Sequence, residues 1–250
     1  MSDIITIGSA TMDVFVECDD AGVVSVKLKD RESQFMSYPY GSKMEITKFD
    51  SQVGGGGVNT AANFANLGFS TGAIFKVGDD IYSQGLFDFF RNKKVDLGSV
   101  IQDRKDSTGF SIILTSFEGD RTVLAHRGAN AHIKKSEIDF EAIKNAKLLY
   151  IAPLNGESNK VLDDIVKYAR EHDTRVCFNA GTTGIKKGFN YLSKILSLDS
   201  QFQCFETSEH HGIERVFIYK GQSYSKVRYN EMKICFTFKN LQKALVLATV

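Results

Sequence analysis

The sequence predicts an α/β protein with a doubly wound, mostly parallel sheet and a small β lid. Short apolar runs that end in turn-forming residues alternate with segments of helical periodicity along much of the 250-residue chain. Such alternation implies right-handed crossovers between parallel strands. Two stretches, at about 13–50 and 108–125, depart from this alternation of strands and helices, because they consist of short alternating apolar and polar residues. We expect them to pair as a lid that covers the main domain.

Five apolar runs account for the predicted strands. The first ends at Gly8, where the backbone can turn sharply, and most of the others also end in turn-forming residues. Inside the second lid stretch, Phe-Glu-Gly-Asp-Arg at 117–121 is typical of a hairpin turn. The predicted strands are 4–7, 73–77, 112–115, 148–152 and 175–178.

Helical spacing of apolar residues predicts three helices. The first, at 58–67, starts beyond four glycines and stops at Gly68, and a second is predicted at 84–92. The third, at 159–171, has the clearest apolar stripe, with charged residues around the rest of its surface. We expect residues 1–198 to form one core domain with its lid. Residues 199–250, where the periodicity blurs, are expected to be an atypical or truncated part of the same domain.

Charge and cysteine content exclude several classes of function. Lysine and arginine number 31 against 30 acidic residues, without long blocks of one sign, so neither nucleic acid nor a membrane is an expected partner. The four cysteines are scattered without a C-x-x-C pair, which argues against a zinc site or a disulfide framework. The N-terminus has an acidic residue where a signal peptide has basic ones. We expect a cytoplasmic protein with a small-molecule ligand.

The most informative segment is the run of four glycines at 54–57. Consecutive glycines are costly to order and usually allow close approach of the backbone. At the start of a helix, free N–H groups and the positive end of the dipole suit an anion or a ring of ligand hydroxyls. A flexible turn is the alternative. Neither a Walker loop nor a G-x-G-x-x-G fingerprint fits the segment.

The run Gly55-Gly56-x-x-Asn59-x-Ala61 resembles the first signature of the ribokinase/PfkB carbohydrate kinases. Three further segments are similar to that family in type and order: Gly-Ser-Ala-Thr-Met-Asp at 8–13, Val-Gly-Asp-Asp at 77–80 and Arg-Gly-Ala-Asn at 127–130. The matches extend over residues 1 to about 198. The resemblance implies a ribokinase-like fold and transfer of the γ-phosphoryl group of ATP to a sugar, with Mg²⁺.

By this resemblance, Asp13, Gly55, Gly56 and Asn59 bind the acceptor, and the aspartate accepts hydrogen bonds from two of its hydroxyls. Taken alone, Asp13 is better explained as an ordinary turn carboxylate, and only its combination with the glycine loop favours a binding role. Many ribokinase-type members carry lysine at the position of Gly56. The resemblance therefore leaves open which sugar or nucleoside is bound.

On the nucleotide side, the resemblance rests on two residues. Asn179 ends a predicted strand where the family often has an Asn-Pro pair near the nucleotide, but the proline is missing here. Gly221 follows a segment that is similar to the family's later strand and glycine turn beside ATP. For Asn179, a simple strand-to-loop asparagine is the alternative.

One part of the family pattern is missing. The family's Gly-Ala-Gly-Asp segment stabilises the transferred phosphate, and its aspartate accepts the hydroxyl proton. No aspartate follows Asp199 in this chain, so no catalytic residue is assigned. We hypothesise that a reading-frame change or internal deletion has replaced the C-terminal third, or that the chain is a degenerate member that binds without transferring phosphate.

The expected function is ATP-dependent phosphorylation of a sugar, impaired in this chain. A sugar or nucleoside sensor without chemistry is the alternative. A third interpretation is an unrelated doubly wound protein whose glycine loop only makes a tight turn. The exposed edges of a lid sheet also favour a homodimer formed through the lid.

Overall fold

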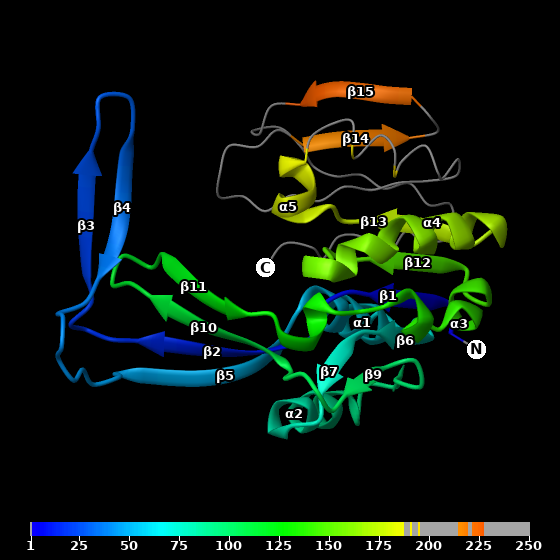
Figure 1. Cartoon of the computed structure of the whole chain (residues 1–250), viewed down its shortest axis with the longest axis horizontal. Coiled ribbons are helices and arrows are strands. Elements are labelled where there is room, and N and C mark those ends of the chain that lie inside the picture. The colour runs from blue at the N-terminus through cyan, green and yellow to red at the C-terminus, as the bar shows by residue number, and fades with distance from the viewer. Residues whose placement is uncertain (1, 188–190, 192–194, 196–214, 220–221, 228–250) are drawn as a thin grey trace.

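A five-stranded parallel sheet forms the centre of the molecule (Figure 1). The computed structural model describes residues 2–187, 191, 195, 215–219 and 222–227. The strand order is β13-β12-β1-β6-β8, and every neighbouring pair is parallel. The predicted mostly parallel sheet is therefore confirmed. The strands are β1 (Ile4–Ile7), β6 (Thr71–Ile74), β8 (Val95–Asp96), β12 (Leu148–Ile151) and β13 (Arg175–Phe178).

Helices cover both faces of this sheet. One face packs on α1 (Gly56–Asn66), and the other packs on α3 (Phe140–Lys144) and α4 (Leu162–Glu171). Ala73 belongs to the core cluster on the α1 side and the next residue, Ile74, to the cluster on the α4 side. Because successive strand residues point to opposite faces, the sheet is doubly wound, as the sequence predicts.

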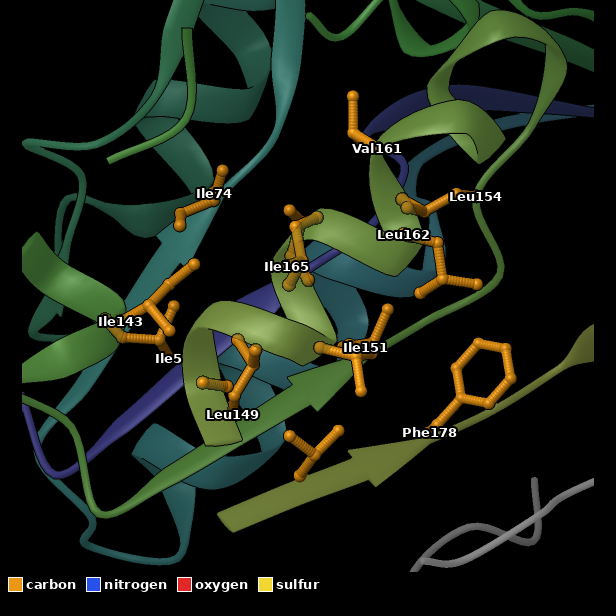
Figure 2. Packing of buried hydrophobic residues seen from close by; sticks show 14 of the residues in the cluster. Ile5, Ile74, Ile143, Leu149, Ile151, Leu154, Val161, Leu162, Ile165 and Phe178 are labelled. Atoms are coloured by element: carbon orange, nitrogen blue, oxygen red, sulfur yellow. The ribbon is translucent and has the colours of Figure 1, made fainter. Parts of the chain in front are cut away.

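The larger core lies between the sheet and α4 (Figure 2). Ile5, Leu149 and Ile151 of the strands lie close to Ile165 of α4, and all four side chains are buried. Burial of such a side chain contributes roughly 1.5–3 kcal/mol to folding. The predicted apolar stripe of this helix is therefore its packing face. The helix predicted at 159–171 is divided, because its first residues belong to a 3₁₀ helix, η3 (Gly156–Val161), and α4 begins only at Leu162.

The lid is a four-stranded sheet beside the main domain, with the order β11-β10-β2-β5. β2 and β10 are parallel, and the other two pairs are antiparallel. The predicted hairpin turn joins β10 to β11, where the Ser116 N–H donates to the Asp120 carbonyl at 2.8 Å and Gly119 has φ +85°. The strands are β2 (Thr11–Glu17), β5 (Lys48–Gly54), β10 (Gly109–Thr115) and β11 (Arg121–His126).

Between β2 and β5, the chain adds a separate two-stranded ribbon. β3 (Gly22–Lys27) and β4 (Glu32–Ser37) pair only with each other and project from the far end of the lid (Figure 1). Val24 and Phe35, which are directly opposite each other, are both exposed. The ribbon therefore presents an apolar stripe to solvent.

The predicted strand at 73–77 is divided between two sheets. β6 ends at Ile74, and β7 (Lys76–Gly78) pairs instead with β9 (Ile101–Asp103). The Lys76 side chain is fully buried and forms ion pairs of 2.9 Å with Asp103 and Glu137. Burial alone would lower the pKa of Lys76, but hydrogen bonds to the two carboxylates outweigh it and raise the pKa. The apolar pattern at 73–77 does not indicate that the chain leaves the central sheet beside this buried lysine.

The remaining elements surround these sheets. They are α2 (Ile81–Phe90), η1 (Gly128–Ala131), η2 (Lys135–Glu137), α5 (Gly181–Lys186) and the antiparallel pair β14 (Arg215–Tyr219) and β15 (Gln222–Val227). Within the described part of the chain, no helix has the length and apolar character needed to cross a membrane.

Candidate functional site

The site lies where the order of the central sheet reverses. From β1, the chain proceeds to β6 on one side of the sheet, and later to β12 on the other side. Ligands of open parallel sheets bind outside the carboxyl ends of the strands at such a point. Here that edge consists of residues 8–10 after β1 and 152–153 after β12.

The glycine loop fits tightly against this edge. Gly55 has φ +96°, and a Cβ atom there would lie 2.5 Å from the Ser9 carbonyl oxygen. A Cβ atom on Gly56 would lie 2.7 Å from that of Ala152, and one on Gly57 would lie 2.9 Å from the carbonyl carbon of Gly8. The close backbone approach predicted for these glycines is therefore present, and the loop is a packed turn.

Hydrogen bonds to Ser9 use the first N–H groups of α1. The Gly56 N–H donates to Ser9 Oγ at 3.0 Å, and the Gly57 N–H donates to the Ser9 carbonyl at 2.9 Å. These are the groups that an anion at the helix N-terminus needs. The expectation of free N–H groups is therefore wrong for these two positions. A ring of ligand hydroxyls suits the site better than an anion.

Asp13 lies in β2 beside the start of this loop. A Cβ atom on Gly54 would be 2.0 Å from Asp13 Oδ2, so the carboxylate rests directly on the glycine backbone. Asp13 Oδ1 is buried and, within the described residues, has no hydrogen-bond partner. A buried acceptor without a donor is costly, and such exceptions call for an explanation. A ligand hydroxyl would supply the missing donor.

Asn59 lies in the first turn of α1 and is exposed. Its N–H donates to the Gly55 carbonyl at 2.9 Å, so the residue is joined to the same loop that Asp13 contacts through Gly54. The fold thus places all four predicted acceptor residues on or beside one glycine loop. Their role in binding remains a prediction.

Asn179 lies at the same edge of the sheet, at the end of β13. Its side-chain oxygen accepts from the Gly181 N–H at 2.8 Å, and a Cβ atom on Gly181 would lie 2.7 Å from Pro153 Cγ. The asparagine therefore forms a local turn beside the end of β12. Gly221 lies outside the described residues. In the described part of the chain, no group of three or more metal-ligating side chains is present.

The Val-Gly-Asp-Asp segment fastens the lid to the main domain. Asp80 caps α2 by accepting from the Ser83 N–H at 2.9 Å, and it also accepts from the N–H and the hydroxyl of Thr108, each at 2.7 Å. Burial alone would raise the pKa of Asp80, but the hydrogen bonds from Thr108 and Ser83 outweigh it and lower the pKa. The carboxylate thus joins α2 to the residue before β10.

Sequence reasoning assigned no role to Ser9 and Asn130, which organise the site. Ser9 binds the glycine loop, and the buried Asn130 side chain makes two hydrogen bonds to the backbone of Ala10. Both lie in segments that carry the family resemblance. Their partners, however, are 47 and 120 residues away along the chain, and no local pattern identifies them.

Comparison with known proteins places this chain in a family of carbohydrate kinases. A family model described as pfkB family carbohydrate kinase matches residues 1–195. The 5-dehydro-2-deoxygluconokinase of Geobacillus kaustophilus is 31% identical over 141 residues, which cover 54% of this chain and 42% of that enzyme. The chain therefore matches less than half the length of this curated relative.

Solved structures share the same architecture. Ribokinase from Giardia lamblia has a TM-score of 0.65 and 20% identity, and the match covers 82% of this chain and 62% of that one. Arabidopsis thaliana ribokinase, complexed with ribose and ATP, has a TM-score of 0.64 and 15% identity, with coverage of 91% and 77%. At these identities, the likeness shows a ribokinase-like fold.

Proposed function

Since this chain belongs to the pfkB family of carbohydrate kinases, we propose that it binds the hydroxyls of a sugar or nucleoside between Asp13, Gly55, Gly56 and Asn59. The observation that carries the proposal is the buried Oδ1 atom of Asp13, which has no hydrogen-bond partner among the described residues. A charged acceptor that is held against a glycine backbone can take hydrogen bonds from neighbouring hydroxyls. The neutral hydroxyls of a sugar or sugar acid match this demand, whereas the carboxylate would repel an anionic group placed directly against it.

ATP with Mg²⁺ is the proposed phosphoryl donor of the lineage. Family membership supports this proposal, as does the ATP in the Arabidopsis ribokinase structure. Of the two predicted nucleotide residues, Asn179 has its side-chain oxygen engaged by Gly181. The described residues therefore offer no complete nucleotide cradle, and we assign no step of phosphoryl transfer to them.

Phosphoryl transfer by this chain is proposed to be impaired, because the sequence has no aspartate after Asp199. Loss of a general base typically slows a reaction by ~10²–10⁴-fold. The alternative function is a sugar or nucleoside sensor, which would retain the acceptor site without chemistry. Binding with coupled ATP turnover supports a kinase, whereas binding without turnover supports the sensor.

Calorimetric titration of the full chain with 5-dehydro-2-deoxygluconate, ribose and adenosine tests the acceptor site. We expect at least one of them to bind, and we expect Asp13→Asn to weaken that binding by about 10–100-fold, since hydrogen bonds to a charged group contribute about 1.5–3 kcal/mol. Asp50→Asn is the matched control, because Asp50 is an exposed carboxylate two residues before Gln52, the β5 partner of Asp13. Unchanged affinity in a folded Asp13→Asn variant would rule out the site.

We also propose that two copies associate through the lid. Within the described residues, eleven of the thirteen exposed large apolar side chains lie between β2 and β5, in β5 itself, or in the hairpin of β10 and β11. The β-sheet register places Phe49 beside Val16 and Leu124 beside Ile112, on the face opposite Asp13. The net charge of +1 gives two copies little mutual repulsion.

Sedimentation analysis tests the association. We expect the wild-type chain to form a dimer and the double variant Phe49→Glu, Leu124→Glu to be a monomer, because charged groups at the centre of an interface are costly to desolvate. Ile81→Glu is the control, since Ile81 is also an exposed apolar residue but lies on α2. A monomeric wild-type chain at micromolar concentration contradicts the proposal.

The proposed location is the cytoplasm. Cys18, in the described part of the chain, is a free thiol. A reduced cysteine suits a reducing compartment.

A further inference from the structure

We propose that Asn130 is a positioning residue that ties the base of the lid to both halves of the acceptor site. Its significance for ligand binding rests on the function proposed above. Asn130 is 4% exposed and lies in η1, directly after the lid strand β11. Its side-chain oxygen accepts from the Ala10 N–H at 2.8 Å, and its side-chain nitrogen donates to the Ala10 carbonyl at 2.7 Å. One carboxamide thus satisfies both backbone groups of a fully buried residue.

The space for this carboxamide depends on a glycine in the lid. A Cβ atom on Gly109 would lie 2.1 Å from Asn130 Nδ2, so any larger residue there would displace the side chain. Gly109 is the first residue of β10 and pairs with Thr11, the first residue of β2. Asn130 is therefore inserted where the two central lid strands leave the main domain.

Ala10 lies between the two parts of the acceptor site. On its N-terminal side, Ser9 accepts from the N–H groups of Gly56 and Gly57 and so holds the glycine loop. On its C-terminal side, β2 begins and carries Asp13. A shift of Ala10 would therefore move the loop and the carboxylate together.

The other end of Asn130 is anchored in the main domain. Its carbonyl accepts from Ser158 Oγ at 2.8 Å, and the same hydroxyl accepts from the Ile133 N–H at 2.8 Å. Ser158 itself is fully buried. The main domain thus holds the backbone of Asn130, while its carboxamide holds the entry to the lid.

The two hydrogen bonds between the Asn130 carboxamide and Ala10, here called the clamp, require one donor and one acceptor on the same planar group. Asn130→Asp keeps the shape and the bond from the Ala10 N–H, but it places a carboxylate oxygen against the Ala10 carbonyl. An unsatisfied or repelled buried group lowers the free energy of local opening. We therefore expect the glycine loop to open more often in this variant.

Hydrogen exchange of the full chain tests the clamp without any ligand. We expect Asn130→Asp to accelerate exchange of the Gly56 and Gly57 N–H groups by about tenfold or more. The Ala152 N–H, which donates to the Ile7 carbonyl at 2.8 Å, should change much less. Thr174→Val is the matched control: it removes a buried hydrogen bond to the Ile143 carbonyl, before β13 and away from Asn130, and should leave the loop protected.

Exchange that rises equally at Ala152, or rises equally in Thr174→Val, would show a general loss of stability and overturn the proposal. Where Asn130→Asp fails to fold, Gly109→Ala provides the second variant, because it displaces the carboxamide without removing it. The same acceleration at Gly56 and Gly57 is then expected, and its absence overturns the clamp.

Titration separates this inference from the proposed function. With 5-dehydro-2-deoxygluconate, ribose and adenosine as probes, we expect Asn130→Asp to weaken binding by about tenfold, and Thr174→Val to leave it within about twofold. If the wild-type chain binds none of the probes, the proposed function is wrong, while the exchange experiment still decides the clamp. Wild-type affinity in Asn130→Asp, with a loosened loop, overturns the positioning role.

Discussion

At the scale of single residues, the site depends on polar side chains whose partners are remote in sequence. Asp13 and the four glycines could be recognised because their spacing resembles a family signature. Ser9 and Asn130 could not be given a role, since each acts through a backbone group of another segment. Even for Asp13, the sequence indicated the residue and the glycine loop, but not that Oδ1 would be buried without a hydrogen-bond partner among the described residues.

Asp80 allows a test of how the lid is fastened. A carboxyl group whose pKa is lower in the folded state stabilises the fold above its ordinary pKa of 3.8, and this contribution is lost as the pH falls through the folded value. We expect Asp80→Asn to reduce the free energy of unfolding by about 1–2 kcal/mol at neutral pH, and by less at a second pH that lies below 3.8.

Urea unfolding at both pH values measures this difference. Asp79→Asn is the control, because Asp79 is mostly exposed and its ion pair with Arg104 is 3.4 Å long. A pH-independent difference between wild type and Asp80→Asn contradicts the assignment.

At the scale of elements, strands were predicted best where an apolar run met a turn-forming residue. β13 has the predicted bounds, because Asn179 follows it directly. α1 begins two residues before its predicted start, since Ser9 satisfies N–H groups that the glycines would otherwise leave free. α2 begins three residues early, where Asp80 and Ser83 form a capping box that the apolar pattern alone does not reveal.

The two ends of α1 should respond very differently to an added methyl group. Gly68 has φ +89° with open space around it, so Gly68→Ala should cost only backbone strain, about 1–2 kcal/mol. At Gly57, a Cβ atom would meet three backbone atoms of Gly8 at 2.9–3.1 Å. We expect Gly57→Ala to cost about 3 kcal/mol or more, because backbone cannot move aside as a side chain can. Equal losses in denaturant unfolding would contradict this account.

At the scale of the whole molecule, the fold class could be predicted because alternation of strands and helices is a property of the entire chain. The division of the predicted lid into a four-stranded sheet and a separate two-stranded ribbon could not be predicted, since alternating polar and apolar residues do not specify which strands pair. After residue 198, the structure describes only β14 and β15. The C-terminal hypotheses therefore remain predictions.

The encoding DNA tests the frame-change hypothesis. If a shifted frame replaced the family's C-terminal third, one of the other two frames downstream of codon 199 should encode a Gly-Ala-Gly-Asp-like run. Translation of all three frames is the measurement. Absence of such a run in every frame removes the frame change and leaves an internal deletion or a degenerate binding protein.

The β3–β4 ribbon has a practical consequence for engineering this molecule. Glu17 and Lys48 face each other at the ends of β2 and β5 and form an ion pair of 3.0 Å, so the lid strands already meet where the ribbon begins. Neither ribbon strand joins the lid sheet. We therefore expect that the β3–β4 ribbon can be excised and the gap closed with a short turn, or that it can be exchanged for another hairpin. In either case, β2, which carries Asp13, and β5 should keep their register.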